Sequence, residues 1–273
     1  MNEAGLQAAF GLLGPLFIAD ARGATIRIPQ AKQRVIMAAL LISANRTVSG
    51  DQLADALWGD KPPPNAASAI RTYVARLRRT LGPVSTRLLR RPAGYAIEVR
   101  EPGELDLAQL DCLHAQAREA TEAGHWDRVV LSSGKALGLW RGCPLEDIPS
   151  ARLYRSIAEQ LDELRLQLAM TRIDAELHLG GEGYVLAELR QLASEHPLRE
   201  HIQAQFMLAC YRCGQQAAAL GIYRKVRASL VDELGVEPGP ELRELHRRIL
   251  AADRALEVEK SGSGLGAGVA RRS

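Results

Sequence analysis

Residues 61–97 combine a helical repeat of apolar side chains with a basic surface that contains no acidic residue. Ile70, Tyr73, Val74, Leu77 and Leu81 share one side of a helix with 3.6 residues per turn. The opposite side carries Ser68, Thr72, Ala75, Arg76 and Arg79, and Arg71 and Arg78 flank it. Solvent-exposed helix faces usually mix charges of both signs, because opposite charges one turn apart stabilise the helix. This segment therefore predicts a helix that is anchored to a core on one side and faces a polyanion, namely nucleic acid, on the other.

The charge of the chain is unevenly distributed. Residues 1–103 hold fourteen Lys and Arg against seven Asp and Glu, a net charge of +7, whereas residues 104–256 hold eighteen against twenty-three, a net charge of −5. A length of 273 residues suits two domains. We therefore expect only the first half to approach DNA or RNA, and aromatic residues are too sparse for stacking on unpaired bases to dominate.

The first half has the element order of a winged helix-turn-helix. Two short strands are predicted at 10–18 and 24–29, followed by a helix at 31–45. Ser49 and Gln52 form a capping box that opens a helix ending near Trp58. A proline-rich loop, 59–64, separates this helix from the basic helix, which Asn65 caps at about residue 66. Strands at 84–90 and 94–99 complete a hairpin, so the pattern predicts a small sheet, three helices and a β-hairpin wing.

The second half is predicted to be entirely helical. We expect helices near 106–123, 125–140, 151–179, 183–195, 198–213, 215–234 and 239–254, with glycine or proline at most of the breaks. Short loops favour antiparallel neighbours, and a loose repeat suggests a tetratricopeptide-like array. The fold class is therefore α+β, with a winged-helix domain at 1–103, an all-α domain at 104–256 and a Gly/Ser-rich tail at 257–273.

No catalytic, cofactor or metal site is predicted. Gly134-Lys135 lacks the other residues of a phosphate-binding loop, and Cys210 and Cys213 have no second cysteine pair to complete a zinc site. Neither a signal peptide nor a membrane-spanning segment is predicted, so we expect a cytoplasmic protein with reduced thiols. The alternative to a DNA-binding protein is a helical-repeat adaptor whose basic segment binds RNA or an acidic protein.

Many short motifs, in order and spacing, resemble the streptomycete antibiotic regulatory protein family. The matching pieces in the first half are Phe10-Gly-x-Leu-Gly-Pro15, Leu53-x-Asp-x-Leu-Trp-Gly59, Arg71-Thr-Tyr-Val-Ala-Arg-Leu-Arg-Arg79 and Gly94-Tyr95. Those in the second half include Ala136-Leu-x-Leu-Trp-Arg-Gly142, Glu195-x-Pro197-x-Arg-Glu200 and Leu230-x-x-Glu-Leu-Gly235-x-x-Pro238. Members of this family join an OmpR/PhoB-type winged helix to a bacterial transcriptional activation domain.

The resemblance implies an activator of antibiotic biosynthesis genes that binds direct repeats in promoter DNA near the −35 element. Protomers would associate side by side on the DNA and recruit RNA polymerase holoenzyme through its sigma or core subunits. By position, Thr72 and Arg76 would face base edges, and Tyr73, Arg78 and Arg79 would meet phosphates. The hairpin would enter the minor groove; Ala96 stands where arginine is common, which leaves that contact to Arg90 or Arg91. The full set of predicted DNA-binding residues is Ser68, Arg71, Thr72, Tyr73, Arg76, Arg78, Arg79, Arg87, Arg90 and Arg91, and the predicted polymerase contact is Asp60, Lys61, Pro62 and Pro63.

Overall fold

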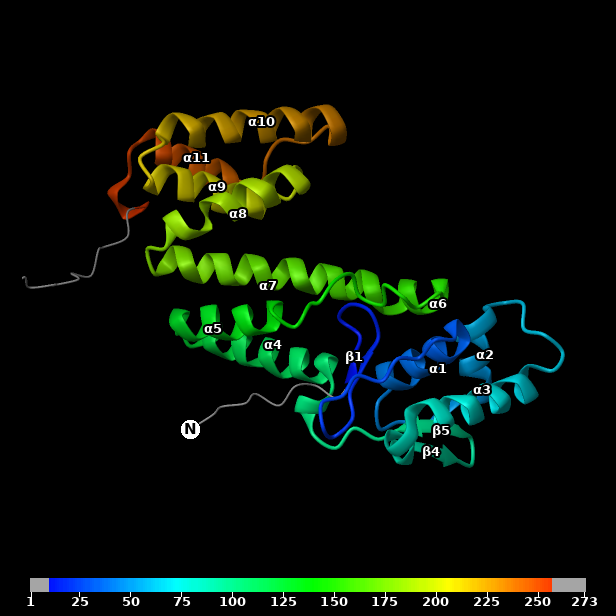
Figure 1. The fold of residues 1–273 in the computed structure, drawn as a ribbon. Helices are drawn as coiled ribbons and strands as arrows, with labels where there is room; N and C mark the ends of the chain where they lie inside the picture. The colour runs from blue at the N-terminus through cyan, green and yellow to red at the C-terminus, as the bar shows by residue number, and fades with distance from the viewer. Residues whose placement is uncertain (1–9, 257–273) are drawn as a thin grey trace, which may run out of the picture. The chain divides into compact units, whose positions relative to one another are not determined.

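The chain begins with a two-stranded sheet that is smaller than predicted. A computed structural model describes residues 10–256 (Figure 1). Strands β1 (Phe10–Gly11) and β2 (Phe17–Ile18) pair antiparallel, so the predicted strand at 10–18 is in fact a tight hairpin. Gly14, with φ of 146°, provides a backbone conformation at the turn that other residues rarely adopt. The strand predicted at 24–29 is reduced to a single bridge between Ala19 and Thr25.

Three helices follow close to their predicted positions: α1 (Ala31–Ile42), α2 (Gly50–Trp58) and α3 (Ala66–Leu81). The capping box at the start of α2 is confirmed, because the Gln52 backbone N–H donates to Ser49 Oγ at 3.1 Å and Ser49 N–H donates to Gln52 Oε1 at 2.8 Å. Asn65 occupies the N-cap position of α3, but its side chain makes no capping hydrogen bond there. The helix therefore begins where predicted without the predicted side-chain cap.

A three-stranded sheet completes the winged helix. Its strands β3 (Val48–Ser49), β4 (Leu88–Arg91) and β5 (Gly94–Ile97) are arranged in the order β3-β5-β4, all antiparallel. The sequence did not predict β3, and the predicted strand at 84–90 begins late because η1 (Gly82–Arg87) is a 3₁₀ helix. Gly94 permits the close strand pairing, since a Cβ there would collide with the Val48 carbonyl oxygen.

The apolar repeat of α3 forms part of the core, as predicted. Ile70, Val74, Leu77 and Leu81 are at most 3 % exposed, and they pack in one cluster with side chains of α1, α2 and the sheet. Tyr73 is only partly buried at the edge of that cluster. Burial of one side of α3 fixes the rotation of the helix and therefore determines which side chains face outwards.

The second half is helical throughout, with breaks at nearly all of the predicted glycines. After η2 (Pro102–Glu104), it contains α4 (Asp106–Glu122), α5 (Trp126–Leu137), α6 (Ala151–Leu153), α7 (Glu159–His178), α8 (Glu182–Glu195), α9 (Glu200–Arg212), α10 (Gln216–Leu234), α11 (Pro240–Leu250) and η4 (Arg254–Leu256). The predicted helix at 151–179 is interrupted by a π-helical turn, η3 (Tyr154–Ala158). The predicted tail at 257–273 lies outside the described residues.

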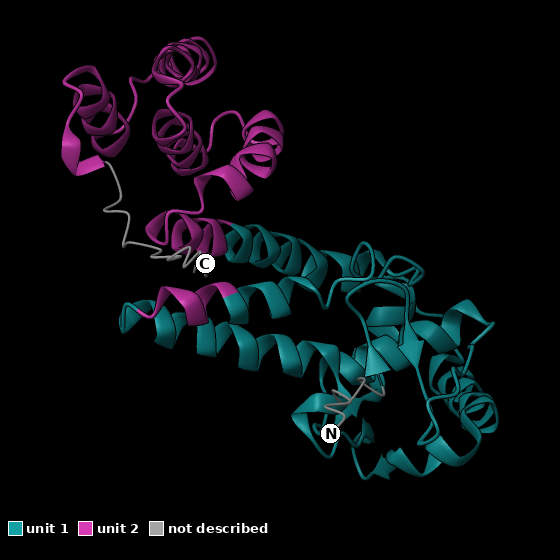
Figure 2. Cartoon of the chain, turned by 60° about the vertical axis from the view of Figure 1, so that its left-hand side comes forward, with its two compact units in different colours: residues 1–124, 131–169 teal, residues 125–130, 170–273 magenta. Residues whose placement is uncertain are grey.

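The chain divides into two compact units, and the division does not fall at residue 103. The first unit comprises Met1–Gly124 and Leu131–Ala169, and the second comprises His125–Val130 and Met170–Ser273 (Figure 2). The first unit therefore includes α4, most of α5 and the beginning of α7. None of the helices in residues 10–256 is long and apolar enough to cross a membrane.

Buried polar contacts explain why residues beyond 103 belong to the first unit. Asp106 is only 3 % exposed, and its carboxylate accepts hydrogen bonds from the backbone N–H groups of Leu12 and Leu13 at 2.8–2.9 Å. Arg141 forms an ion pair with Asp106 at 3.3 Å. Ser150 Oγ donates to the Ala56 carbonyl oxygen at 2.6 Å, at the end of α2. The first helices of the second half thus complete the fold of the winged helix.

Candidate nucleic-acid interface

The outer face of α3 is exposed and basic, as the sequence predicts. Ser68, Arg71, Thr72, Arg76 and Arg79 are all exposed, opposite the buried repeat. Within residues 10–256, none of these three arginines forms an ion pair with an acidic side chain. Their guanidinium groups are therefore available to an external anion, and no acidic residue of α3 itself would repel one.

Thr72 and Tyr73, in the N-terminal half of α3, differ in their surroundings. Thr72 Oγ1 donates to the Ser68 carbonyl oxygen at 3.1 Å, which fixes its orientation while leaving the hydroxyl oxygen free to accept. The predicted phosphate contact Tyr73 is half-buried, and its ring packs against the core of the winged helix.

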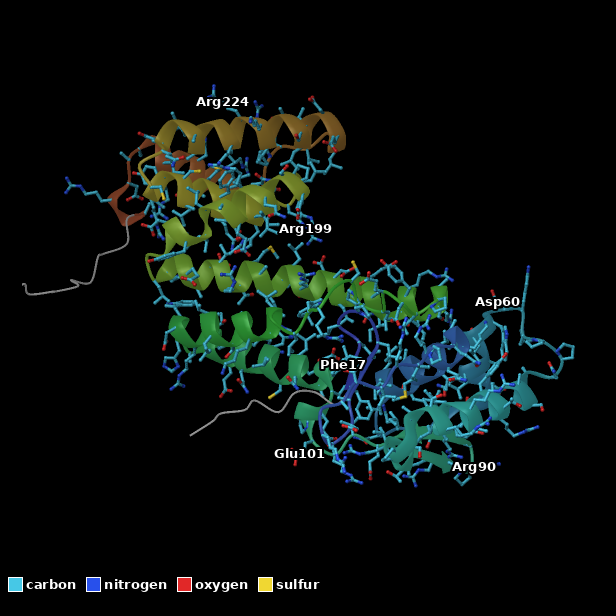
Figure 3. The ribbon with its side chains drawn as sticks, in the orientation of Figure 1. Phe17, Asp60, Arg90, Glu101, Arg199 and Arg224 are labelled. Atoms are coloured by element: carbon cyan, nitrogen blue, oxygen red, sulfur yellow. The ribbon has the colours of Figure 1, made fainter. Side chains whose placement is uncertain are left out.

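The hairpin brings two further arginines towards α3. Arg90 and Arg91 pair with Tyr95 and Gly94 across the hairpin, and both arginine side chains are exposed at its tip (Figure 3, Arg90). A hollow of about 190 Å³ between the hairpin and α3 is lined by Arg71, Arg90 and Arg91, among other residues. The structure thus gathers three predicted DNA-binding arginines from two elements at one place.

Two other predicted contacts, Arg78 and Arg87, are engaged inside the domain. The Arg78 guanidinium donates to the Leu88 carbonyl oxygen at 3.0 Å, which ties the hairpin to α3. Arg87 forms a two-pronged ion pair with Glu104, with N–O distances of 2.5 and 2.8 Å, and both side chains are less than a fifth exposed. The hydrogen bond from Arg87 lowers the pKa of Glu104 to about 2. Sequence reasoning missed this pair, because Glu104 lies beyond the acid-free segment.

The proline-rich loop between α2 and α3 extends away from the sheet. Asp60, Lys61 and Pro62 are exposed and Pro63 is partly buried (Figure 3, Asp60). Gly59, with φ of 60°, turns the chain out of α2, and Pro63 accepts the Ala66 N–H at 3.0 Å where α3 begins. The loop therefore leaves and rejoins the helices at defined points and presents one acid and one base at its tip.

The β-hairpin wing lies beside a basic helix, α3, whose exposed arginines form no ion pair with an acidic side chain of the described residues. This arrangement defines the class of protein: a winged helix-turn-helix DNA-binding protein with a helical second half. Comparison with known families agrees. Residues 27–97 match the family described as "Transcriptional regulatory protein, C terminal", and residues 105–250 match the "Bacterial transcriptional activator domain".

Three relatives combine these regions. The chain is 42 % identical over 247 residues to the regulatory protein AfsR of Streptomyces coelicolor, covering 90 % of this chain and 24 % of AfsR. It is 33 % identical over 255 residues to the regulatory protein DnrI of Streptomyces peucetius, covering 90 % of this chain and 93 % of DnrI. A structure titled "Mycobacterium tuberculosis EmbR in complex with low affinity phosphopeptide" superposes with a TM-score of 0.82 at 35 % identity, covering 89 % of this chain and 65 % of that one.

The chain belongs to the streptomycete antibiotic regulatory protein family, whose two characteristic regions it contains. This confirms the predicted fold class, and the family comprises regulators rather than enzymes. The chain spans about a quarter of the length of the AfsR proteins that it matches.

Proposed function

We propose that the protein binds promoter DNA with α3 in the major groove and the hairpin in the minor groove, and activates genes of antibiotic biosynthesis. The exposed, unpaired arginines of α3 and the hairpin carry this proposal. Arg76 projects from the middle of the outer face, where a guanidinium can donate two hydrogen bonds to guanine O6 and N7. Arg71, Arg79, Arg90 and Arg91 surround it and would contact phosphates or the minor groove.

Arg78 and Arg87 take a different role in this proposal from the one that the sequence predicts. Because each already binds an acceptor within the domain, they hold the hairpin and the 3₁₀ helix in position. They would therefore affect DNA affinity mainly through the placement of Arg90 and Arg91. The gene targets, the direct repeats near the −35 element and the side-by-side binding of protomers rest on the family resemblance.

The loop formed by Asp60, Lys61, Pro62 and Pro63 is proposed to contact RNA polymerase. Its exposure and its separation from the basic face of α3 leave it accessible when α3 lies in a groove. One carboxylate and one ammonium group, with prolines that restrict the backbone, suit a specific contact with a folded protein surface.

The experiment that tests this division uses single-residue variants of the whole chain, because residues beyond 103 complete the first unit. Asp60→Ala and Lys61→Ala should leave the footprint on a promoter unchanged and lower transcription by purified polymerase several-fold. Arg76→Ala should weaken the footprint itself. A loop variant that transcribes as well as the wild type would remove the loop from the polymerase contact. Equal affinity for single-stranded RNA and duplex DNA would favour the adaptor alternative.

A further inference from the structure

The outer face of α3 has one non-polar side chain near its centre. Of the five residues that form this face, Ser68, Thr72, Arg76 and Arg79 are polar or charged, whereas Ala75 is not. Ala75 is exposed, and helical spacing places it one turn from Thr72 on one side and one turn from Arg79 on the other. It is not among the DNA-binding residues that the sequence predicts.

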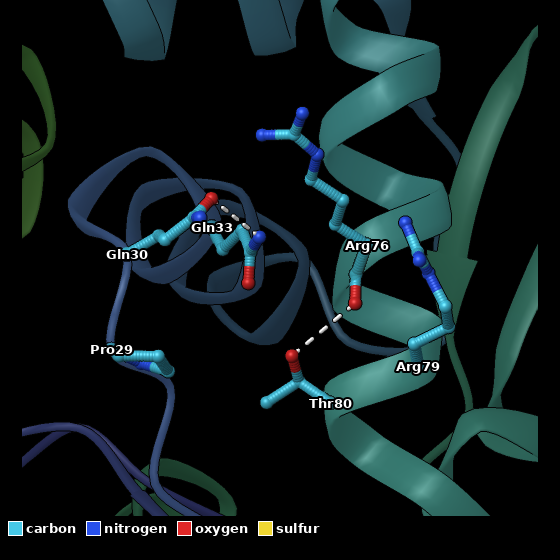
Figure 4. A pocket seen from close by; sticks show the side chains of 6 residues that line it. All are labelled: Pro29, Gln30, Gln33, Arg76, Arg79 and Thr80. Atoms are coloured by element: carbon cyan, nitrogen blue, oxygen red, sulfur yellow. Dashed lines mark hydrogen bonds between the residues drawn. The ribbon is translucent and has the colours of Figure 1, made fainter.

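Arginine side chains border Ala75 on several sides. Arg71 and Arg79 lie one turn before and one turn after it, and Arg76 follows it directly in the sequence. Figure 4 shows the side chains of Arg76 and Arg79 extending from α3 towards its N-terminus, as long side chains of helices usually do. Ala75, by contrast, has only a methyl group, so the helix backbone can come close to a bound surface at this point. The face is therefore a non-polar spot enclosed by positive charges.

The hydrogen bond of Thr72 adds a second methyl group to this spot. Thr72 Oγ1 donates to the Ser68 carbonyl oxygen at 3.1 Å. Threonine in a helix has two common χ1 rotamers, and a bond of this kind turns the hydroxyl group towards the helix backbone. The Cγ2 methyl group is therefore the part of the side chain that points outwards. Because residues three apart on a helix are surface neighbours, the methyl groups of Thr72 and Ala75 form one non-polar surface.

The major groove of DNA offers one non-polar group that matches this surface, the 5-methyl group of thymine. The other groups that distinguish base pairs there are hydrogen-bond donors and acceptors, and alanine or the methyl group of threonine is a suitable contact for thymine. Contact between methyl groups removes non-polar surface from water, which favours binding. An exposed alanine can also serve only as a good helix former, but the thymine methyl group would then make no difference to affinity.

We infer that Ala75 and Thr72 together recognise a thymine in the binding site by contact with its 5-methyl group. The inference rests on the proposed function, in which α3 lies in the major groove, and it adds the identity of one base to that proposal. Because Ala75 directly precedes Arg76, the thymine should lie within about two base pairs of the guanine that Arg76 contacts. The contact also favours DNA over RNA, since uracil lacks this methyl group.

Deoxyuridine substitution tests the contact with the full-length chain and the promoter duplex that footprinting locates. Deoxyuridine differs from thymidine only in lacking the 5-methyl group, and each thymine of the site is replaced singly. At one thymine close to the guanine contacted by Arg76, the wild type should lose about fourfold in affinity, as expected for one buried methyl group. Absence of such a thymine, in a duplex that the wild type binds, would overturn the inference and leave the proposed function intact. Failure of the wild type to bind any duplex would instead refute the proposed function.

Two variants test whether Ala75 and Thr72 make the contact. Ala75→Gly removes one methyl group, and Thr72→Ser removes the other while keeping the hydroxyl group; each should bring the affinities for the thymine and deoxyuridine duplexes closer together. The two duplexes are compared within each variant, so the loss of helix stability expected for glycine cancels. Ala228→Gly, at an exposed position of α10, is the matched control and should keep the difference seen in the wild type.

Thr72→Ser provides the test alone if Ala75→Gly does not fold. A difference between the two duplexes that stays as large in the folded variants as in the wild type would show that another residue contacts the thymine, and it would overturn the inference. Loss of the difference in Ala228→Gly as well would show that it does not depend on the outer face of α3, with the same consequence.

Discussion

The basic face of α3 and the surface of the second unit differ in the surroundings of their arginines. On α3 and the hairpin, Arg71, Arg76, Arg79, Arg90 and Arg91 are exposed and form no ion pair within the described chain. Among the described residues of the second unit, four arginines pair with nearby acids, namely Arg172 with Glu188, Arg227 with Glu237, Arg247 with Glu244 and Arg248 with Asp253, while others such as Arg190 and Arg224 are exposed without an ion pair. A paired guanidinium has little net charge to offer a polyanion. The comparison therefore suggests a criterion for the proposed DNA-binding surface: several unpaired arginines gathered on a segment without acidic residues, rather than the number of arginines.

The largest expected effect comes from the buried side of α3, which holds the basic face in place. Leu77 is fully buried, so Leu77→Asp would place an unpaired carboxylate in the core and should destabilise the first unit by about 4 kcal/mol or more. Leu77→Met, which nearly conserves volume, should cost less than about 1.5 kcal/mol. Denaturant unfolding followed by circular dichroism measures both. Similar stability for the two variants would contradict the assigned rotation of α3.

Arg76→Ala tests whether an unpaired arginine contributes to DNA binding. It should weaken binding to the specific site by about 1–3 kcal/mol and relax the preference at one base position. Thermal stability should stay unchanged, because Arg76 makes no side-chain contact with an acid. The matched control is Arg247→Ala, which removes a guanidinium already paired with Glu244. Equal losses for the two variants in a gel-shift titration would erase the distinction between paired and unpaired arginines.

Arg87 should behave as a paired arginine although it lies within the basic segment. Arg87→Ala should destabilise the first unit by about 1–3 kcal/mol, since it leaves the Glu104 carboxylate without its partner. Because the folded pKa of Glu104 is lowered from its usual 4.5 to about 2, this stability is present above pH 4.5 and is lost as the pH falls towards 2. Urea titrations of both proteins between pH 6 and 2 should therefore converge at the acidic end. A constant difference across that range would contradict the pairing.

The smallest effect is expected in the second unit, at His201. Its Nε2 lies 3.0 Å from the Asp174 carboxylate, and this hydrogen bond raises the pKa of His201 above 6.5. A raised pKa means that the protonated pair stabilises the fold below pH 6.5 and that this contribution disappears as the pH rises through the folded pKa. An NMR titration of the imidazole should show that pKa falling in Asp174→Asn. DNA affinity should not follow this titration, and a parallel pH dependence would link the second unit to DNA binding.

Much of this organisation follows from sequence patterns, because the responsible forces are local. The repeat of Ile70, Val74, Leu77 and Leu81 predicts the buried side of α3, and the capping box at Ser49 predicts the start of α2. Short elements are less predictable: β3 has two residues and depends on pairing with β5, which is distant in the sequence. The hairpin within residues 10–18 is also difficult to predict, because its two strands of two residues each have the sequence pattern of a single strand.

For the candidate interface, the sequence correctly predicts the exposure only of those side chains that have no partner within the domain. The composition of residues 61–97 predicts the exposed arginines, yet it does not separate Arg76 from Arg87, because Glu104 lies outside that segment and meets Arg87 only in the folded chain. Likewise, Asp106 reads as an ordinary helix start in sequence, and only folding shows that it binds the backbone of residues 12 and 13.

The dependence of duplex affinity on salt tests the central claim most directly. Each phosphate neutralised by a free arginine contributes about −0.9 to the slope of log affinity against log salt concentration. If four or five of the unpaired arginines and their neighbours meet phosphates, the slope should be about −4 for the wild type. It should become shallower by about one in Arg79→Ala and stay nearly unchanged in folded Arg87→Ala. A wild-type slope shallower than about −2, or the same shift for Arg87 as for Arg79, would contradict the account that the unpaired arginines form the DNA-binding surface.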